Sequence, residues 1–127
     1  MTFRMSFEGP TLMIQFTGTL TPADLEAVAD AMLAVEKEGT YTPHRLTDLR
    51  EITEPIVGYA EIAQLAERSR TRPLAAPIRS AILVGQPVQL GLARMFQILN
   101  DHPQITLRVF EDEGAARAWI ASGDVDV

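Results

Sequence analysis

Four charged side chains gather at the end of a predicted strand over residues 45–49, and they are the first candidates for chemistry: Asp48, Arg50, Glu51 and Glu54. Binding sites in open α/β sheets form at the carboxyl ends of strands, where paired carboxylates could act as general acid and base. The alternative is a solvated acidic loop before a helix, because helix N-termini attract negative charge. We favour the loop and keep Asp48 and Arg50 as candidate contacts to a ligand or partner, with no catalytic residue assigned.

Arginines recur at the end of a predicted helix over residues 58–70 and just beyond it: Arg68, Arg70 and Arg72. Cations at a helix C-terminus complement the helix dipole, which is a sufficient structural reason for them. With Arg79, which is near in sequence, they could instead hold a phosphate or an anionic lipid head group through charge-assisted hydrogen bonds. We favour the structural role and keep the anion site as the alternative.

A third candidate segment lies in a predicted helix that begins at Gln86-Pro87. Gly91 in its first turns costs about 1 kcal/mol relative to alanine, so we expect another group to pack closely against it. Met95 is most simply a core residue, whereas Arg94 emerges on another face, where it could pair with a carboxylate or a partner.

Several catalytic and cofactor classes are excluded by what the sequence lacks. The chain has no cysteine, and its histidines, His44 and His102, each lie beside a proline, so we expect solvent-exposed loop histidines and no metal site. No Gly-x-Ser-x-Gly elbow, P-loop or Gly-x-Gly-x-x-Gly fingerprint occurs. We therefore expect no catalytic residue and no cofactor.

Composition and length limit the partners, the compartment and the number of domains that the chain can have. A formal net charge of −6 argues against a nucleic-acid partner, and no apolar run reaches the length of a membrane span. The absence of cysteine fits a reducing compartment, and residues 1–9 lack the apolar segment of a secretory signal, so we expect a cytoplasmic protein. At 127 residues the chain fits a single domain, 1–127.

The elements that position these residues follow from hydrophobic periodicity. Period-two alternation and a Gly9-Pro10 turn predict an N-terminal hairpin, and helical spacing with caps marks the helices. The predicted strands cover 2–8, 11–17, 45–49, 78–84 and 106–110, and the predicted helices run between Thr21 and Gly39, over 58–70, from Gln86 to Leu99 and over 113–121.

This order predicts an α/β fold: an N-terminal β-hairpin, then alternating β-α units, in a mainly parallel or mixed sheet of about five strands with four helices. The continuous apolar run 78–84 marks a strand covered on both faces. Val88, Leu92 and Phe96 are expected to face the core, as is Trp119 in the last helix. We expect residues 122–127 to form a frayed tail.

Four segments resemble the SpoIIAA-like family of STAS-like domains, relatives of anti-sigma-factor antagonists in bacteria: TLMIQFTGTLTPADLEAV, RLTDLREI, AILVGQPVQLGLARMFQILN and LRVFEDEGAARAWI. The resemblance spans nearly the whole chain. It implies a SpoIIAA-like fold and a non-enzymatic module that acts through protein partners or self-association. The group also includes lipid binders.

The resemblance allows one functional motif to be checked. Antagonists of this kind carry an Asp-Ser-(Ser/Thr)-Gly turn before the second helix, and its first serine is phosphorylated. Gly58 matches the glycine of that turn, but Pro55-Ile56-Val57 precedes it, so the serine position is apolar. We expect no phosphoserine switch of that type, and Gly58 stays a candidate contact only.

Two functions of different class remain. One is the interaction module, with a homodimer expected because Phe3, Met5 and Phe7 make the outer strand apolar and only lightly charged. The other is a carrier or sensor of a small apolar or lipid-like ligand bound between helices and sheet. Abundant alanine and methionine permit a cavity there, but they equally describe an ordinary core. A large apolar cavity favours the carrier, and a filled core with an exposed apolar patch favours the interaction module. An enzyme ranks third.

Overall fold

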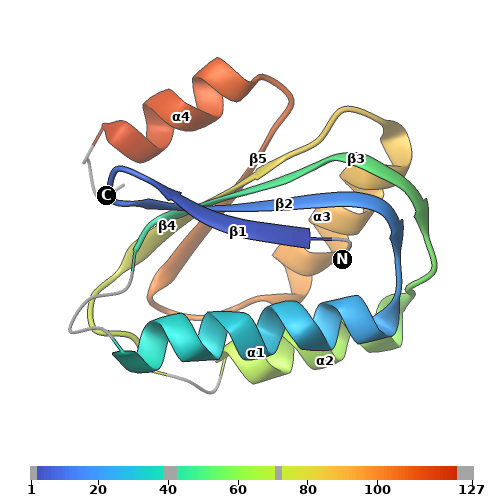
Figure 1. Ribbon diagram of the computed structural model, residues 1–127, viewed down its shortest axis with the longest axis horizontal. Coiled ribbons are helices and arrows are strands. Elements are labelled where there is room, and N and C mark those ends of the chain that lie inside the picture. The colour runs from blue at the N-terminus through green and yellow to red at the C-terminus, as the bar shows by residue number, and fades with distance from the viewer. Residues whose placement is uncertain (1–2, 39–42, 71–72, 123–127) are drawn as a thin grey trace.

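The structure, a computed structural model, describes residues 3–38, 43–70 and 73–122. Within those residues, strands and helices alternate after an N-terminal hairpin (Figure 1). Their bounds, in chain order, are β1 Phe3–Glu8, β2 Thr11–Leu20, α1 Pro22–Glu38, β3 Arg45–Pro55, α2 Tyr59–Arg70, β4 Ile78–Leu83, α3 Pro87–Leu99, β5 Ile105–Phe110 and α4 Glu113–Ala121.

The strands form one sheet in the order β1-β2-β3-β4-β5. β1 pairs antiparallel with β2, and each later neighbour pairs in parallel. A helix covers the sheet between successive parallel strands, as parallel connections require. The predicted mixed α/β fold, with its antiparallel N-terminal edge, is confirmed.

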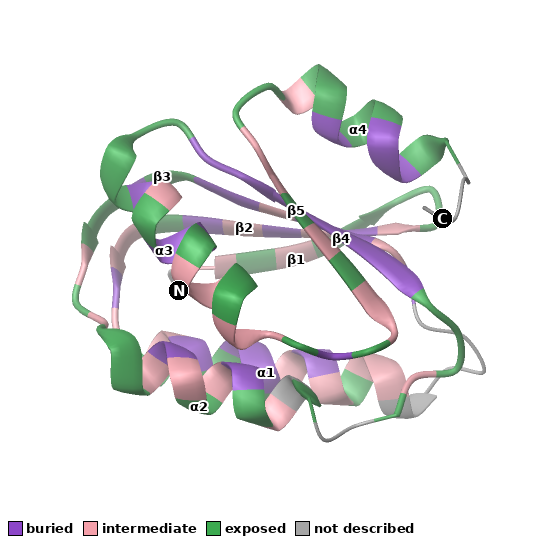
Figure 2. Cartoon of the chain, turned by 180° about the vertical axis from the view of Figure 1, so that it is seen from behind, coloured by how far each residue is buried: buried purple, intermediate pink, exposed green. Residues whose placement is uncertain are grey.

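The helices lie in two layers. α1, α2 and α3 cover one face of the sheet, and α4 alone covers part of the other (Figure 1). The larger core lies on the three-helix face, and the smaller one joins Leu46 and Ala81 to Ala116, Trp119 and Ile120 of α4. Every residue of β4 is buried, because both layers cover it (Figure 2). That explains its nearly continuous apolar sequence.

Local signals in the sequence start two of the helices. The backbone N–H of Thr21 donates to the Asp24 carboxylate at 2.8 Å, and the Asp24 N–H points back to the Thr21 hydroxyl at 3.3 Å. This is the reciprocal capping predicted for α1. In α4, Asp112 accepts the N–H of Ala115 at 2.9 Å, as predicted for its cap.

β3 is longer than its predicted span of 45–49. Its register with β4 ends at Asp48↔Leu83, but its pairing with β2 continues past two irregularities to Leu20↔Pro55. The acidic and basic cluster from Asp48 to Glu54 therefore lies on an extended strand. The predicted loop is wrong, although Arg50, Glu51 and Glu54 are exposed, as the solvated interpretation expects. Among the strands only β2 pairs with this half of β3, and the Gln89 side chain of α3 donates to its carbonyls at Arg50 and Ile52.

In α3, two predictions are wrong. Val88 is 48% exposed, and Gln89 is buried in its place. No atom lies within 4 Å of the position that a Cβ on Gly91 would occupy, so nothing packs closely against that glycine. The face of α3 toward the sheet begins at Gln89 and continues through Leu92, Ala93 and Phe96.

The histidines are not solvent-exposed loop residues, contrary to prediction. His102 is buried, and its Nδ1 accepts the backbone N–H of Gln104 at 3.0 Å. His44 is half-buried, and its Nδ1 accepts the N–H of Arg79 at 2.8 Å. Each imidazole satisfies a backbone donor near the start of a parallel strand.

Three predicted features lie outside the described residues: the Gly39 helix stop, the candidate contact Arg72, and residues 123–127 of the tail. Among the helices that the structure describes, none has both the length and the apolar character needed to cross a bilayer.

Candidate functional site: an apolar cavity beneath three helices

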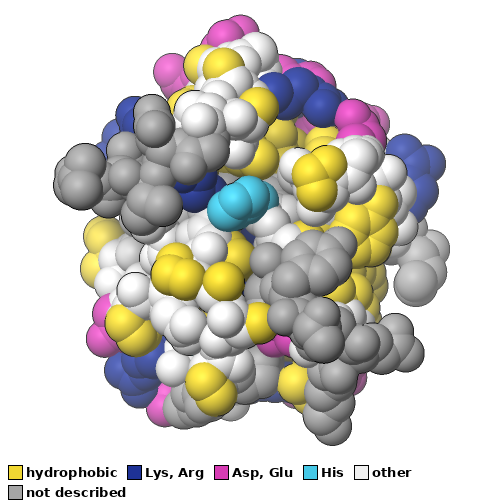
Figure 3. Space-filling model, turned by 90° about the vertical axis from the view of Figure 1, so that its left-hand side faces the viewer, with side chains coloured by type: hydrophobic (Ala, Val, Ile, Leu, Met, Phe, Trp, Pro, Cys, Tyr) yellow, Lys and Arg dark blue, Asp and Glu magenta, His cyan; other side chains and the backbone are white. Residues whose placement is uncertain are grey.

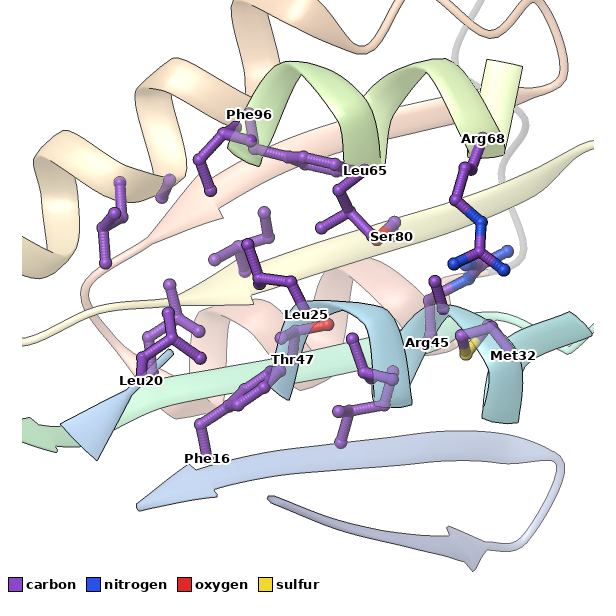
Figure 4. A pocket seen from close by; sticks show the side chains of 18 residues that line it. Phe16, Leu20, Leu25, Met32, Arg45, Thr47, Leu65, Arg68, Ser80 and Phe96 are labelled. Atoms are coloured by element: carbon purple, nitrogen blue, oxygen red, sulfur yellow. The ribbon is translucent and has the colours of Figure 1, made fainter. Parts of the chain in front are cut away.

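A cavity of about 140 Å³ lies between the sheet and its three-helix layer (Figure 4). Its lining comes from β2, β3 and β4 below and from α1, α2 and α3 above. The described lining residues are Ile14, Phe16, Leu20, Leu25, Val28, Ala29, Met32, Arg45, Thr47, Leu49, Ile62, Leu65, Arg68, Ser80, Ile82, Leu92, Ala93 and Phe96.

Small residues help to keep this space open. Ala29 on α1 and Ala93 on α3 are both buried and both line the cavity, at positions where a larger side chain would occupy part of it. Protein interiors are normally packed without such voids, and an unfilled apolar cavity lowers stability. The void is therefore a feature to be explained by function.

The cavity floor changes polarity along the strands. Successive cavity-facing residues of β3 are Arg45, Thr47 and Leu49, and those of β4 are Ser80 and Ile82. Arg45 and Ser80 are direct partners in the strand register, so the polar residues lie side by side where the two strands begin. The cavity thus has a polar end at the amino termini of β3 and β4 and an apolar end toward Leu49 and Ile82.

Two arginines define the polar end. Figure 4 shows Arg45 and Arg68 at the same end of the pocket, beside Met32. They are the charged residues among the described lining. Arg45 pairs with Glu36 at 3.3 Å, and about nine-tenths of both side chains is buried. Arg68 pairs with Asp30 at 2.7 Å in a more exposed bridge between α2 and α1.

Figure 3 shows the end of the molecule at which β3 and β4 begin. A histidine reaches the surface there beside a basic side chain and among apolar and uncharged atoms. Burial, and then the nearby charge of Arg79, lowers the pKa of His44 from its ordinary value of 6.5. Neutral imidazole can accept the Arg79 N–H, so the shift and the hydrogen bond agree.

The residues that line the cavity can form apolar contacts and hydrogen bonds with a ligand. Among the described lining residues there is no histidine and no carboxylate, so the cavity provides no general acid–base pair. Residues 3–38, 43–70 and 73–122 also contain no cluster of three or more side chains suited to a metal ion.

The predicted acidic and basic cluster lies elsewhere, in a network that joins β3 to α4. Arg50 pairs with Asp48 at 2.9 Å and with Glu113 at 2.8 Å. The hydrogen bonds to Asp48 and then to Glu113 raise the pKa of Arg50, while the hydrogen bonds from Arg117 and then Arg50 lower that of Glu113. These charges fasten α4 to the sheet, which accounts for Asp48 and Arg50 without a ligand.

The described arginines of the predicted anion site do not converge. Arg70 pairs with Glu67 and lies 3.6 Å from Asp101. Arg79 is on the opposite face of the sheet, where it packs on the Trp119 ring and donates to the Trp119 carbonyl. Of these three described arginines, Arg68 lines the cavity and the other two do not.

The remaining candidates have structural roles or lie on the surface. The Gly58 N–H donates to Glu61 at 2.6 Å at the start of α2. Gly91 and Arg94 are exposed, and Met95 packs against the main core. Sequence reasoning missed Arg45, Thr47 and Ser80. The signal was present in the alternation Arg45-x-Thr47-x-Leu49, which places two polar residues on the core face of a central strand.

The fold defines a small α/β domain with an apolar cavity between its sheet and three of its helices. A sequence model described as SpoIIAA-like matches residues 11–121, so the chain belongs to the SpoIIAA-like family. None of the curated proteins compared with the chain matches it.

Solved structures share the fold at low identity. An uncharacterised DUF3478-family protein with a SpoIIAA-like fold from Shewanella loihica PV-4 is 19% identical, with a TM-score of 0.60 over 93% of this chain and 91% of that one. An anti-sigma factor antagonist from Mycobacterium paratuberculosis is 13% identical, with a TM-score of 0.64 over 94% and 92%. SpoIIAA in its unphosphorylated form is 14% identical, with a TM-score of 0.58 over 98% and 99%.

Proposed function

We propose that this SpoIIAA-like domain is a non-enzymatic cytoplasmic binding module that carries or senses a small apolar ligand. The observation that supports this function is the apolar cavity of about 140 Å³ beneath α1, α2 and α3. A dry cavity of about 150 Å³ lined by Leu, Ile and Phe is known to accept benzene, so the volume and lining here suit a ligand of that size.

The choice between a carrier and an interaction module depends on whether apolar side chains gather on the outer surface or around the internal cavity. Large apolar side chains on the outside are spread over several elements: Phe7 on β1, Ile56 and Tyr59 around the start of α2, and Val88 and Ile98 on α3. Single exposed apolar residues are ordinary on protein surfaces. The cavity, in contrast, gathers its apolar residues around one space, which favours ligand binding.

The test is binding of benzene to the purified chain, followed by amide chemical shifts in NMR, after native mass spectrometry has shown whether a ligand is retained from expression. We expect shifts in residues around the cavity. Ala93→Leu should fill the space and abolish them, whereas Ala118→Leu, on the exposed face of α4, should leave them unchanged. Absence of saturable binding in the ligand-free protein would overturn the proposal.

A second function, self-association or binding of a protein partner, is favoured by the uncovered edge of the sheet. β1 is the outermost strand, and Phe7 on it is 53% exposed. We propose that such an interaction is not controlled by a phosphoserine before α2. The turn there reads Pro55-Ile56-Val57-Gly58, without a hydroxyl side chain.

A further inference from the structure

The polar end of the cavity is costly to the fold, which is the first indication of the ligand's chemistry. Arg45, Thr47 and Ser80 occupy core-facing positions on central strands, where apolar side chains would be the ordinary choice. Replacing a buried ion pair by apolar residues is often neutral or stabilising, so the Arg45–Glu36 pair is weak evidence of a stabilising role. Polar side chains gathered at one end of an otherwise apolar cavity indicate a ligand with a polar group at that end.

The charges at that end favour an anion. Both charged lining residues, Arg45 and Arg68, are cations, whereas their partners Glu36 and Asp30 do not line the cavity. A guanidinium has five N–H donors, so it can hold a protein carboxylate and a ligand oxygen at once. The fork of an arginine matches a carboxylate in particular, through two parallel hydrogen bonds.

The volume limits the apolar part. A cavity of about 140 Å³ corresponds to one benzene ring, or about six carbon atoms. A long-chain lipid has more than twice as many carbon atoms and exceeds this space. Bulky core side chains, among them Phe16, Leu20 and Leu92, line the cavity, so the chain of a longer ligand would meet the core.

We propose that the ligand is a small organic acid, an aromatic or short aliphatic carboxylate with about six carbons in its apolar part. Its carboxylate lies against Arg45 and Arg68, with the hydroxyls of Ser80 and Thr47 beside it. Its ring or chain extends toward Leu49 and Ile82. This inference rests on the proposed function, because it assigns the chemistry of the same cavity.

The experiment compares ligands that share an apolar part but differ in charge. Isothermal titration calorimetry of the full chain at neutral pH would use benzoate against benzyl alcohol, hexanoate against 1-hexanol, and palmitate as the long acid. We expect each short acid to bind at least about tenfold more tightly than its alcohol, which corresponds to about 1.4 kcal/mol. Palmitate should bind more weakly than hexanoate.

Two arginines on α2 provide the variant and its control. Arg68 lines the cavity and Arg70 does not, while their side chains are similarly exposed, at 39% and 44%. Arg68→Met should reduce the preference for acid over alcohol by about the same tenfold factor, and Arg70→Met should leave it unchanged. Circular dichroism and thermal unfolding confirm that each variant is folded.

The outcomes separate the two proposals. Equal binding of acids and alcohols would overturn the assignment of a carboxylate and leave the apolar binding site standing. An equal loss in Arg68→Met and Arg70→Met would show attraction by overall charge and overturn the role of Arg68. Tighter binding of palmitate than of hexanoate would overturn the size limit. Failure of every ligand, with benzene also failing to shift the cavity amides, would remove both proposals.

Discussion

Gln89 is the residue that most tightly connects α3 to the sheet. Its side-chain oxygen accepts the backbone N–H groups of Gly85 at 2.8 Å and Gln86 at 3.0 Å. Its side-chain nitrogen donates to the carbonyls of Arg50 at 2.9 Å and Ile52 at 3.0 Å. The buried amide thus makes its full set of four hydrogen bonds and satisfies the backbone where β3 leaves β4.

Gln89→Leu should lower the free energy of unfolding by at least about 3 kcal/mol, because it removes the partners of four backbone groups whose hydrogen bonds are buried or part-buried. Urea denaturation measures the loss. Gln64→Leu, at an exposed position of α2, is the matched control and should stay within about 0.5 kcal/mol of the parent. A Gln89→Leu protein as stable as its control would show that water replaces the amide.

His44 predicts a pH dependence of stability. Its folded-state pKa lies below 6.5, so below that pH the unfolded chain binds more protons than the folded one, and stability falls as the pH decreases toward the folded pKa. His44→Asn keeps an acceptor for the Arg79 N–H but does not titrate. The difference in unfolding free energy between parent and variant should therefore be constant above pH 7 and change below about pH 6.5. A difference independent of pH would contradict the shift.

Gly91 offers a stabilising change. A Cβ there meets no atom within 4 Å, and the residue lies inside α3. Gly91→Ala should raise the free energy of unfolding by about 0.5–1 kcal/mol, since it restricts the unfolded chain and suits the helix. Gly18→Ala is the opposing control, because Gly18 has a φ of 76° and should lose stability. A loss of stability in Gly91→Ala would reveal a contact at that position in solution.

Residue roles could be predicted from the sequence only where they depend on local patterns. The Thr21–Asp24 capping and the Asp112 cap follow from spacing and were predicted. The roles of Gln89 and His44 depend on backbone groups that tertiary structure brings near, and a polar residue in a sequence pattern gives no sign of them. Arg68 belongs to a local arginine cluster, so the sequence marks it as a candidate. Arg45 stands alone at the start of a predicted strand, and no such cluster marks it as a cavity residue.

At the scale of elements, α4 is fastened to the sheet by one aromatic side chain and a set of charges. Trp119 is 9% exposed, and its ring centroid lies 5.6 Å from that of Phe110. The guanidinium groups of Arg79 and Arg108 lie 5.1 and 5.6 Å from the centre of the same ring. The predicted role of Trp119 as a core residue is confirmed, and its ring also carries cation–π contacts.

Trp119→Ala should cost about 3–5 kcal/mol of stability, because α4 has few other apolar anchors on its face of the sheet. Chemical denaturation followed by circular dichroism measures the change. Ala118→Gln, on the exposed side of the same helix, should be nearly neutral. Since α4 covers the face opposite the cavity, a folded Trp119→Ala protein should still bind a cavity ligand, and its free energy of unfolding should rise with the logarithm of ligand concentration once that concentration exceeds Kd.

The order of the elements could be predicted because periodicity and turn residues specify each one locally. Their lengths could not. The extension of β3 to Pro55 depends on two irregularities in its register with β2. It also depends on hydrogen bonds from the Gln89 side chain to carbonyls of β3, which are distant from Gln89 in sequence. The cavity likewise depends on how far α1 and α2 stand from the sheet, which side-chain packing across elements decides.

For the whole molecule, the outer edge of β1, one of the two edge strands of the sheet, is a surface that the fold does not explain. Glu8 and Thr11 flank the two-residue turn and form a pair, so the backbone groups of Glu8, Ser6 and Arg4 point toward β2. Those of Phe3, Met5 and Phe7 then point outward. Met5 packs against the main core, however, so it is not a suitable residue for testing an interface.

We predict that the chain forms a two-fold dimer through antiparallel pairing of β1 with β1 of a second copy. Pairing centred on Met5 sets Phe7 opposite Phe3 of the other copy, which would cover the exposed Phe7 ring and satisfy the outward backbone groups. Sedimentation equilibrium at micromolar concentration should give about twice the chain mass of 14.0 kDa.

Phe7→Lys should shift this equilibrium to the monomer without unfolding the subunit, because Phe7 is 53% exposed within one chain and a lysine there would place a charge against the apolar Phe3 ring of the other copy. Ile98→Lys, at an 80% exposed position on α3, adds the same charge away from the edge and should leave the dimer intact. A parent protein that sediments at 14.0 kDa would rule out the dimer. Dissociation by both variants alike would place the interface elsewhere, since it would follow net charge and not the edge of β1.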